Sequence, residues 1–328
     1  MKKNIAVIGC GHWGKNLVRN FSELGGLAAV CDPDAAVATK YARQYCVDNL
    51  PWKAVIQDDD IEGIVLAVPA PLHAPLAIEA LNSGKHVYVE KPLAMDKAEA
   101  KKMILAAENN HVRLMVGHLL HYHPSFLALK ELVLSGELGD LRYIYSNRLS
   151  FGKVRTEEDV IWSFAPHDIS MVLALAGQEP KLVMTEASNI LQKDIADIAT
   201  IHLSFASELK AHISVSWLHP HKEQKLVVIG ESAMAVFDDT KPWPEKLTIF
   251  RQKVEINNGF PRLEESGNEY LDVKQSEPLK NECAHFMDVV AGKVNPKTDG
   301  YEGLSVLNVM SAASLSAKQK HSVRVSDI

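Results

Sequence analysis

Val7-Ile8-Gly9-Cys10-Gly11-His12-Trp13-Gly14 is the stretch that decides the fold of this chain, because its glycines have the spacing Gly-x-Gly-x-x-Gly. Residues 5–8 are short and apolar, which is typical of a buried parallel strand, and the apolar residues from Trp13 onward recur at helical spacing. In such a turn from strand to helix, the first glycine permits the bend, the second exposes backbone to a pyrophosphate, and the third lets the helix pack on the strand. The helix N-terminus adds free N–H groups and a positive dipole end. The stretch therefore predicts a dinucleotide site that includes Gly9, Gly11, His12, Trp13 and Gly14.

Asp32 strengthens this prediction, because it ends a second apolar segment over residues 27–32. It follows the glycines by about 20 residues, where a carboxylate can accept hydrogen bonds from the adenosine ribose. We expect NAD rather than NADP, since Asp32 would repel a 2′-phosphate and no arginine follows it directly. Asp32 could also cap a helix in Asp32-Pro33-Asp34, where proline suits the first turn. The two roles are compatible.

The bulk composition describes a globular chain that is long enough for two domains, with 328 residues, 47% hydrophobic and 23% charged. A net charge of −6 argues against nucleic acid as a partner. The four cysteines form no Cys-x-x-Cys pair, so neither a disulfide framework nor a zinc site is indicated. No apolar run approaches the roughly 18 residues of a membrane span. We therefore expect a soluble, cytoplasmic protein with no membrane partner.

Residues 1–120 alternate between strand and helix patterns, which predicts an α/β dinucleotide-binding domain with a doubly wound parallel sheet of the Rossmann type. Ligands of such sheets bind beyond the carboxyl ends of the strands. Asp96 and Glu99 have the spacing of a capping box at the start of a helix. The expected strands are residues 63–68, 86–89 and 113–116, and the expected helices are residues 72–81 and 96–110.

Residues 121–328 are predicted to form an α+β domain for substrate binding and oligomerisation, built on a large, mostly antiparallel sheet. Residues 251–277 are polar and predicted to be loop. If helices cover only one face of the sheet, the other face is free to form a homodimer or homotetramer. The expected strands are residues 141–151, 199–205, 209–217, 225–229 and 233–237, and the expected helices are residues 124–134, 167–176, 279–290 and 304–315.

Glu90-Lys91-Pro92 directly follows a predicted buried strand, on the side of the sheet where a nicotinamide would lie. Burial and a nearby positive ring both lower the pKa of a lysine towards a range that suits proton transfer. Pro92 restricts the backbone next to Lys91 and could adopt a cis bond, although sequence does not show the isomer. The alternative is that Glu90 and Lys91 form an ordinary surface pair.

Pro166-His167-Asp168, at the entry to a predicted helix, supplies a second candidate for proton transfer, since histidine is the commonest general base near neutral pH. The alternative is a helix-capping Asp168 beside an incidental histidine. Residues 152–159 precede it with cations and carboxylates, of which Lys153 and Arg155 could bind a diphosphate. A solvated charged loop is the alternative for that stretch.

The histidines at 118, 121 and 123 have no acidic or cysteine ligand at recognised metal spacing, so no metal is expected. His118 and Tyr122 follow a predicted strand end and are candidates to line the substrate cleft. Trp162 and Asp168, near the charged stretch and His167, complete the candidate substrate residues.

Taken together, Gly9-x-Gly11-x-x-Gly14, Val68-Pro69 followed by His73, Glu90-Lys91-Pro92 and the helix at His167 resemble the glucose-fructose oxidoreductase and inositol dehydrogenase (Gfo/Idh/MocA) family over nearly the whole chain. The resemblance implies an NAD-dependent oxidoreductase with cofactor contacts at Pro69, His73, Glu90 and Lys91. It also implies that Lys91 and His167, from separate domains, flank the sugar carbon that exchanges hydride with nicotinamide. Many members carry an aspartate four residues before the histidine, where this chain has Ser163, which puts any mechanism that needs that carboxylate in question.

Within the family, residues 117–120, 152–157 and 164–170 resemble the branch that acts on UDP-N-acetylglucosamine. That resemblance implies oxidation of the sugar 3-hydroxyl, with His167 or Lys91 accepting its proton, before transamination in cell-surface polysaccharide or lipid A biosynthesis. The alternatives are a dehydrogenase of UDP-N-acetylglucosaminuronate, inositol or a free sugar, and a non-catalytic NAD-binding regulatory protein.

Overall fold

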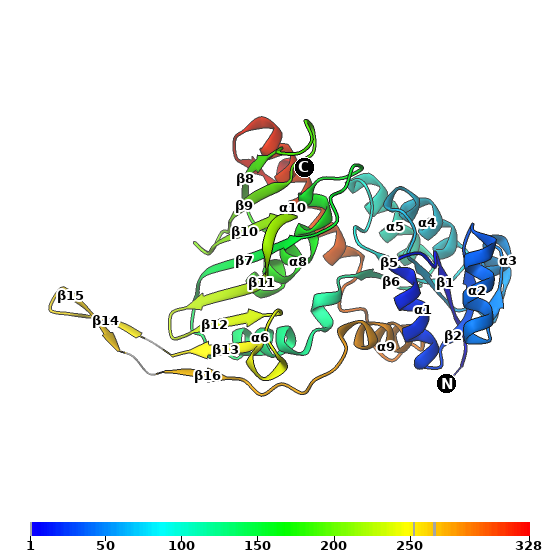
Figure 1. Cartoon of the computed structure of the whole chain (residues 1–328), viewed down its shortest axis with the longest axis horizontal. Helices are drawn as coiled ribbons and strands as arrows, with labels where there is room; N and C mark the ends of the chain where they lie inside the picture. Colours follow the sequence, from blue (N-terminus) through cyan, green and yellow to red (C-terminus); the bar gives the residue numbers. More distant parts are fainter. Residues whose placement is uncertain (1, 252, 265–266) are drawn as a thin grey trace. The chain divides into compact units, whose positions relative to one another are not determined.

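The computed structural model describes residues 2–251, 253–264 and 267–328, and the chain divides into two compact units (Figure 1). Unit 1 consists of Met1–Tyr122 and Ser276–Leu307, and unit 2 consists of His123–Gln275 and Asn308–Ile328. The chain thus leaves unit 1 after Tyr122, and a later segment returns to it. This return is made by helix α9 (Pro278–Val290) and the first part of helix α10 (Gly300–Gln319).

Unit 1 contains a six-stranded sheet with the order β3-β2-β1-β4-β5-β6, in which every neighbouring pair is parallel. The order reverses between β1 and β4, and such a switch point is where ligands of doubly wound sheets bind. The α/β class expected from the sequence is confirmed. The strands are β1 (Ile5–Ile8), β2 (Leu27–Cys31), β3 (Asp48–Asn49), β4 (Gly63–Leu66), β5 (His86–Glu90) and β6 (Leu114–Gly117), and the helices are α1 (Gly14–Glu23), α2 (Ala35–Tyr45), α3 (Trp52–Gln57), α4 (His73–Asn82) and α5 (Lys97–Asn109).

Side-chain caps fix where two of these helices begin. Asp34 caps α2 by accepting hydrogen bonds from the backbone N–H groups of residues 36 and 37, and Asp96 caps α5 by accepting from Glu99 N at 2.8 Å. The capping box expected at Asp96 is incomplete, because the Glu99 carboxylate accepts from Met95 N at 3.3 Å and not from Asp96 N.

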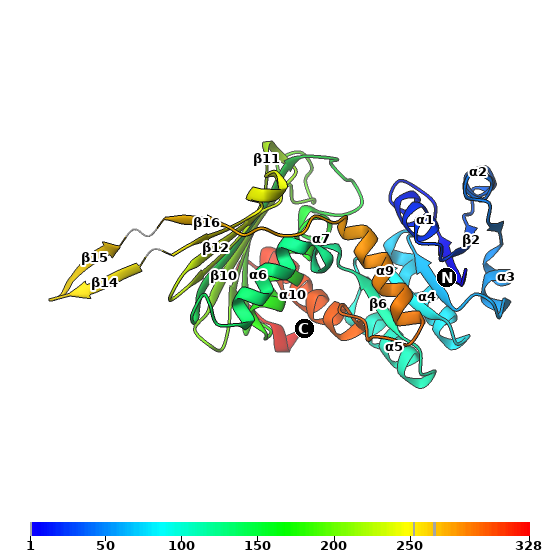
Figure 2. The same ribbon diagram turned by 90° about the horizontal axis from the view of Figure 1, so that it is seen from below.

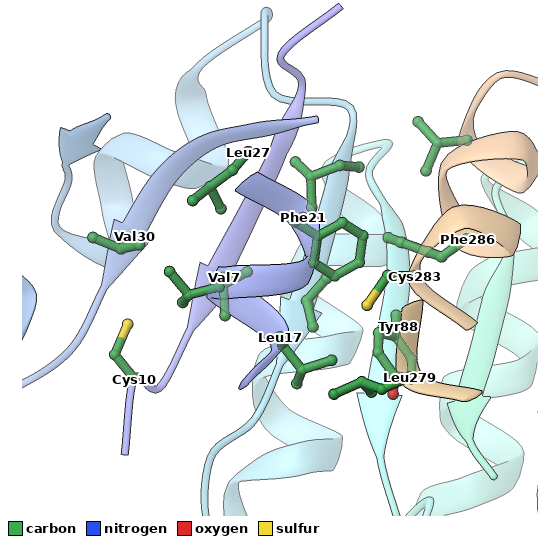
Figure 3. Packing of buried hydrophobic residues seen from close by; sticks show 14 of the residues in the cluster. Val7, Cys10, Leu17, Phe21, Leu27, Val30, Tyr88, Leu279, Cys283 and Phe286 are labelled. Carbon is green, nitrogen blue, oxygen red and sulfur yellow. The ribbon is translucent and has the colours of Figure 1, made fainter. Parts of the chain in front are cut away.

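The core of unit 1 joins α9 to the N-terminal part of the chain (Figure 3). Phe286 of α9 packs edge-on against Phe21 of α1, with ring centroids 6.2 Å apart, and lies 5.7 Å from the ring of Tyr88 in β5. All three side chains are fully buried. The apolar face of α9 is therefore an integral part of unit 1.

Unit 2 is built on a nine-stranded sheet with the order β16-β13-β12-β11-β7-β10-β9-β8-β17. Neighbouring strands are antiparallel except β7 and β10, which run parallel, so the expected mostly antiparallel sheet is confirmed. Helix α6 (Pro124–Leu134) lies against one face (Figure 2), and helix α8 (Ala165–Ala176) packs on β7 and β10. Helix α7 (Val160–Ser163) precedes α8, and the strands are β7 (Leu141–Phe151), β8 (Leu182–Ser188), β9 (Ile198–Ser204), β10 (Lys210–Ser216), β11 (Leu218–Gly230), β12 (Met234–Asp238), β13 (Leu247–Phe250), β16 (Asn268–Tyr270) and β17 (Val323–Arg324).

The expectation that residues 251–277 are entirely loop is wrong, because the described part of this segment contains β16 and a hairpin of β14 (Lys253–Asn257) and β15 (Phe260–Glu264). Asn257 pairs with Phe260, which leaves Asn258 and Gly259 as a two-residue turn with φ values of 51° and 82°. Asn-Gly with two positive φ angles is the usual type I′ hairpin turn. Strand β8 was also not expected, since much of its second half is exposed and lacks apolar alternation.

Candidate dinucleotide and substrate site

The glycine-rich turn has the shape that a pyrophosphate requires. A Cβ added to Gly9, whose φ is +87°, would lie 2.5 Å from Ala67 O, and one added to Gly14 would lie 1.8 Å from Gly9 O. A Cβ on Gly11 would meet no heavy atom within 4 Å. The first and third glycines are thus required by packing, while the second faces open space. The residues present therefore fit the dinucleotide expected from the sequence.

Asp32 lies just beyond β2 and is tied to the glycine-rich turn. Its Oδ2 accepts a hydrogen bond from Cys10 N at 2.7 Å, and its Oδ1 accepts from Asp34 N at 2.9 Å. The suggestion that Asp32 itself caps the next helix is wrong, because Asp34 is the cap of α2. Each carboxylate oxygen has a second lone pair, so Asp32 can still accept hydrogen bonds from a ribose hydroxyl.

Glu90 connects the glycine-rich turn to the segment that carries Lys91. Its Oε1 accepts from Trp13 Nε1 at 2.6 Å and from the Tyr88 hydroxyl at 3.0 Å. Burial raises the pKa of Glu90, and these two donors offset part of that rise by stabilising the carboxylate. Lys91 follows as a half-buried residue, and its peptide bond to Pro92 is cis. Glu90 and Lys91 are therefore not an ordinary exposed surface pair.

His73 braces the loop that follows Lys91. It is 1% exposed, and its ring nitrogens lie 2.7 Å from Pro92 O and 3.0 Å from Val68 O. Burial lowers the pKa of its imidazole. The structure thus gives His73 a supporting place between two backbone segments, while Pro69 and His12 are exposed. Contacts of these three residues with the cofactor remain predictions.

His118 and Tyr122 are held inside unit 1 by residues that the sequence analysis did not single out. His118 is 1% exposed and its Nδ1 lies 2.6 Å from Glu302 Oε2, while the Tyr122 hydroxyl lies 3.2 Å from Thr298 Oγ1. Their roles as substrate contacts remain predictions. Glu302 also lies 3.8 Å from His121 Nε2, yet no group of three or more potential ligands for a metal ion occurs in the parts of the chain that the structure describes.

His167 and Asp168 lie in the first turn of α8. Asp168 is 1% exposed, and its carboxylate accepts from Arg148 Nε and from Ser146 Oγ, both at 2.5 Å and both on β7. It does not cap the helix, whose N-cap is Phe164. Asp168 thus anchors α8 to the sheet and fixes the turn that bears the half-buried His167. A direct contact of Asp168 with substrate remains a prediction.

The charged loop before α7 is partly ordered by internal bonds. Arg155 Nη1 lies 3.0 Å from Glu158 Oε1, and Arg155 O accepts from Gln192 Nε2 at 2.8 Å. Lys153 is exposed. Trp162 is fixed by a hydrogen bond from its Nε1 to Ser314 Oγ at 3.0 Å. Lys153 therefore presents its charge to solvent, while Arg155 is already paired.

Sequence reasoning missed the partners that hold these side chains, which include Arg148, Ser146, Tyr88 and Glu302. All but Tyr88 are distant in sequence from the residues they contact. One of them, Glu302, is separated from His118 by 184 residues.

Two family models match the chain in sequence. The model of an oxidoreductase family with an NAD-binding Rossmann fold matches residues 3–118, and the model of the GFO/IDH/MocA C-terminal domain matches residues 126–236. In a separate observation, none of the helices among the described residues has the length and apolarity to cross a membrane.

Two proteins from other organisms are similar to this chain over almost their whole length. UDP-N-acetylglucosamine 3-dehydrogenase of Acidithiobacillus ferrooxidans is 26% identical over 302 residues, which cover 92% of this chain and 93% of that protein. Inositol 2-dehydrogenase of Rhizobium meliloti is 22% identical, with 99% of this chain and 100% of that protein covered.

Solved structures show the same fold. The structure of the Acidithiobacillus ferrooxidans UDP-N-acetylglucosamine 3-dehydrogenase has a TM-score of 0.84 at 23% identity, covering 97% of this chain and 99% of that one. An oxidoreductase from Agrobacterium radiobacter, solved with NAD⁺, L-tartaric acid and magnesium, has a TM-score of 0.82 at 18% identity, covering 100% of this chain and 99% of that one.

Proposed function

The chain belongs to the GFO/IDH/MocA family of NAD-binding oxidoreductases, and on this premise we propose that it oxidises the 3-hydroxyl of a UDP-sugar, UDP-N-acetylglucosamine. The product would be the 3-keto sugar, which a transaminase could then convert to an amino sugar. This is the kind of building block used in cell-surface polysaccharide or lipid A biosynthesis.

The observation that carries the proposal is the link between the glycine-rich turn and Glu90-Lys91-Pro92. The hydrogen bond from Trp13 to Glu90 joins the glycine-rich turn, which is the expected phosphate site and is called the phosphate cradle below, to the segment that carries Lys91. Both lie at the carboxyl ends of strands, β1 and β5. A dehydrogenase needs its proton-transfer group at the same end of the sheet as the cofactor. This arrangement supports Lys91 as a catalytic residue.

In the proposed reaction, the 3-hydroxyl loses its proton to His167 or Lys91, and carbon 3 loses a hydride. NAD, when bound, supplies the two-electron acceptor. Lys91 would also donate a hydrogen bond to the oxygen as negative charge develops on it. His167 is held for its role by the anchoring of α8 through Asp168. Ser163, buried in α7, replaces the family aspartate, so the mechanism uses no carboxylate at that position.

The exposed charge of Lys153 supports a nucleotide sugar over a neutral sugar, because an ammonium in solvent can approach a diphosphate. The similarity to an inositol dehydrogenase supports the second candidate, a dehydrogenase of inositol. The rates of oxidation of UDP-N-acetylglucosamine, inositol and UDP-N-acetylglucosaminuronate should therefore be compared under the same conditions.

We also propose that the chain forms a homodimer or homotetramer through the nine-stranded sheet. Ile144 and Ser146 of β7 are buried, and the residues between and beside them, such as Tyr143 and Tyr145, point to the other face. There the ring of His212 stacks on Tyr145 with centroids 5.3 Å apart. Light scattering tests this, and a monomer at assay concentration would contradict it.

The deciding experiment is a screen for NADH formation with UDP-N-acetylglucosamine, UDP-N-acetylglucosaminuronate and inositol, coupled to an aminotransferase that removes the ketone product. We expect the highest rate with UDP-N-acetylglucosamine. A higher rate with inositol would replace the proposed substrate, and no reduction of NAD by any substrate would favour a regulatory NAD-binding protein.

A further inference from the structure

Glu282 occupies an unusual position for a carboxylate, on the apolar face of α9. The residues of this helix that are buried at helical spacing include Leu279, Glu282, Cys283 and Phe286, and Glu282 is 0% exposed. Figure 3 shows the flanking side chains of α9 directed into the same core as Phe21 and Tyr88. A charged carboxylate in such surroundings is strongly disfavoured unless it has partners.

The groups around Glu282 connect the core of unit 1 to Glu90, which is bonded to Trp13 of the glycine-rich turn. Tyr88 and Glu90 on β5 both act on the ionisation of Glu282, and Glu282 in turn raises the pKa of the Cys283 thiol on α9 and of the Tyr122 phenol. Burial and the negative charge of Glu90 raise the pKa of Glu282 well above its ordinary range, and the Tyr88 hydroxyl lowers it to a lesser extent.

The two buried carboxyl groups differ in the donors available to them. Glu90 Oε1 accepts from Trp13 Nε1 and from the Tyr88 hydroxyl, and Glu90 Oε2 accepts from Lys91 N at 3.3 Å. By ordinary hydrogen-bond geometry, neither oxygen of Glu282 has a partner among the residues that the structure describes. Two interacting buried carboxyl groups do not both ionise, and the one with donors keeps the charge. The proton therefore belongs on Glu282.

Tyr88 can connect the two groups because a phenol hydroxyl both donates and accepts. Its single proton is already directed to Glu90, 3.0 Å away, so its lone pairs remain for an incoming donor. A protonated Glu282 is such a donor. The same region is tightly packed, since a Cβ on Gly117 would lie 2.9 Å from the Tyr88 hydroxyl and 3.0 Å from Glu90 Oε2.

We propose that Glu282 is a positioning residue of the dinucleotide site, a neutral acid that donates to Tyr88 and thereby holds Glu90 against Trp13 and next to Lys91. The Tyr88 hydroxyl already donates to Glu90, and a proton on Glu282 would add the first donor of this chain, in which each donor polarises the next. Through this chain, a helix near the C-terminus of the sequence sets the shape of the glycine-rich turn at its N-terminus.

The first experiment compares three variants by NAD titration, Glu282→Gln, Glu282→Leu and Tyr88→Phe. Glutamine is neutral and can donate, so Glu282→Gln should bind NAD within about twofold of the unmodified protein. Glu282→Leu and Tyr88→Phe each interrupt the chain and should raise the Kd for NAD about tenfold, as expected when a buried polar group loses its partner. The double variant Glu282→Leu/Tyr88→Phe should be no weaker than either single variant, since both act through one network.

The second experiment measures the proton directly by infrared spectroscopy. The unmodified protein should show the carbonyl stretch of a protonated carboxylic acid near neutral pH, and Glu282→Gln should lose that band. This measurement decides the protonation state even if Glu282→Leu fails to fold. Glu131→Gln, at an exposed position of α6, is the matched control and should change neither the band nor the Kd for NAD.

The proposal is overturned if Glu282→Gln weakens NAD binding as much as Glu282→Leu, if Tyr88→Phe leaves the Kd unchanged, or if the carboxylic acid band persists in Glu282→Gln. The kinetic role of Lys91 rests on the proposed function, but NAD titration and infrared spectra need no sugar. A protein that oxidises none of the tested sugars can therefore still confirm or contradict the role of Glu282.

Discussion

The indole nitrogen of Trp13 donates to Glu90 Oε1 at 2.6 Å, and this bond joins two segments that lie 77 residues apart in the sequence. Trp13 is the last residue before the helix that begins at Gly14, so a bond that fixes Trp13 also fixes the end of the phosphate cradle. Glu90 ends β5 and precedes Lys91. The bond therefore couples the place where the cofactor phosphates are expected to the place where proton transfer is proposed.

Removing this bond should weaken cofactor binding. Trp13→Phe keeps an aromatic ring but removes the N–H donor, so the Kd for NAD should rise about tenfold. The matched control is Trp52→Phe, because Trp52 Nε1 donates in the same way to Glu79, an exposed carboxylate outside the site, at 2.8 Å. Equal NAD affinity in the two variants would show that the Trp13–Glu90 bond does not shape the cradle.

The proposed catalytic roles predict a loss of turnover without a loss of cofactor. Lys91→Ala and His167→Ala should each lower kcat by about 10²-fold or more, the usual effect of removing a general acid or base. The Kd for NAD should stay close to that of the unmodified protein. Lys102→Ala, at an exposed position of α5, serves as the control. Near-normal kcat in both test variants would contradict the assignment.

Asp32 should determine the preference for NAD. Asp32→Ala removes the expected ribose contact and the charge that repels a 2′-phosphate, so the ratio of kcat/KM for NAD to that for NADP should fall. Asp34→Ala separates this effect from helix capping, since it should destabilise α2 by about 1 kcal/mol. Its cofactor ratio should stay the same. If the ratio is unchanged in Asp32→Ala, Asp32 does not select NAD, and its role is limited to the hydrogen bonds from Cys10 N and Asp34 N.

The buried pair of Arg148 and Asp168 predicts a large effect on stability. Asp168 is 1% exposed in its side chain and Arg148 13%, so Asp168→Ala leaves a mostly buried guanidinium without its partner. The free energy of unfolding in urea should fall by about 3–5 kcal/mol. Arg142→Ala is the control, because its pair with Glu231 is 58% and 60% exposed and should contribute about 1 kcal/mol or less. The double variant Arg148→Ala/Asp168→Ala should recover part of the lost unfolding free energy, because it leaves no unpaired guanidinium. If it recovers none, the unpaired charge is not the cause of the loss.

The raised pKa of Glu282 predicts how stability depends on pH. Its folded-state pKa lies above the ordinary value of 4.5, so between these two values the folded protein binds more protons than the unfolded chain. The stabilising contribution is complete below pH 4.5 and is lost as pH rises through the folded-state pKa. The groups that interact with Glu282 are Glu90, Tyr88, Cys283 and Tyr122.

Glu282→Gln has no such titration. The difference in unfolding free energy between Glu282→Gln and the unmodified protein should therefore grow with pH, by at most about 1.4 kcal/mol per unit. Urea unfolding at several pH values measures it. A constant difference across that range would mean that Glu282 ionises at its ordinary pKa.

Much of the fold could be predicted because its determinants are local. The glycine spacing depends on backbone contacts within a few residues, and Gly9 and Gly14 are required by packing as expected. Helix α6 has the predicted bounds because Pro124 at its first position and Ser135-Gly136 after its last residue mark its limits, and strand β7 has the predicted bounds because apolar and polar residues alternate along it. The hairpin at Asn258-Gly259 was predictable from its turn residues, but the polar composition of the whole segment 251–277 obscured it.

The partners of the candidate residues were not predictable, because they depend on tertiary contacts between distant segments. Nothing near His118 indicates that Glu302 binds it, and nothing near Asp168 indicates that its carboxylate is taken by Arg148. Glu282 did leave one indication in the sequence. It is a charged residue at a position of α9 where helical spacing requires an apolar one.

The return of α9 to unit 1 has a consequence for synthesis on the ribosome. When residues 1–122 have emerged, the core around Phe21 and Tyr88 still lacks Cys283 and Phe286, which are fully buried in the finished protein. The first third of the nascent chain must therefore wait, with apolar surface exposed, until nearly the whole polypeptide has been translated. Such a chain is a natural client for a chaperone, and a fragment that stops at residue 122 should aggregate when expressed alone.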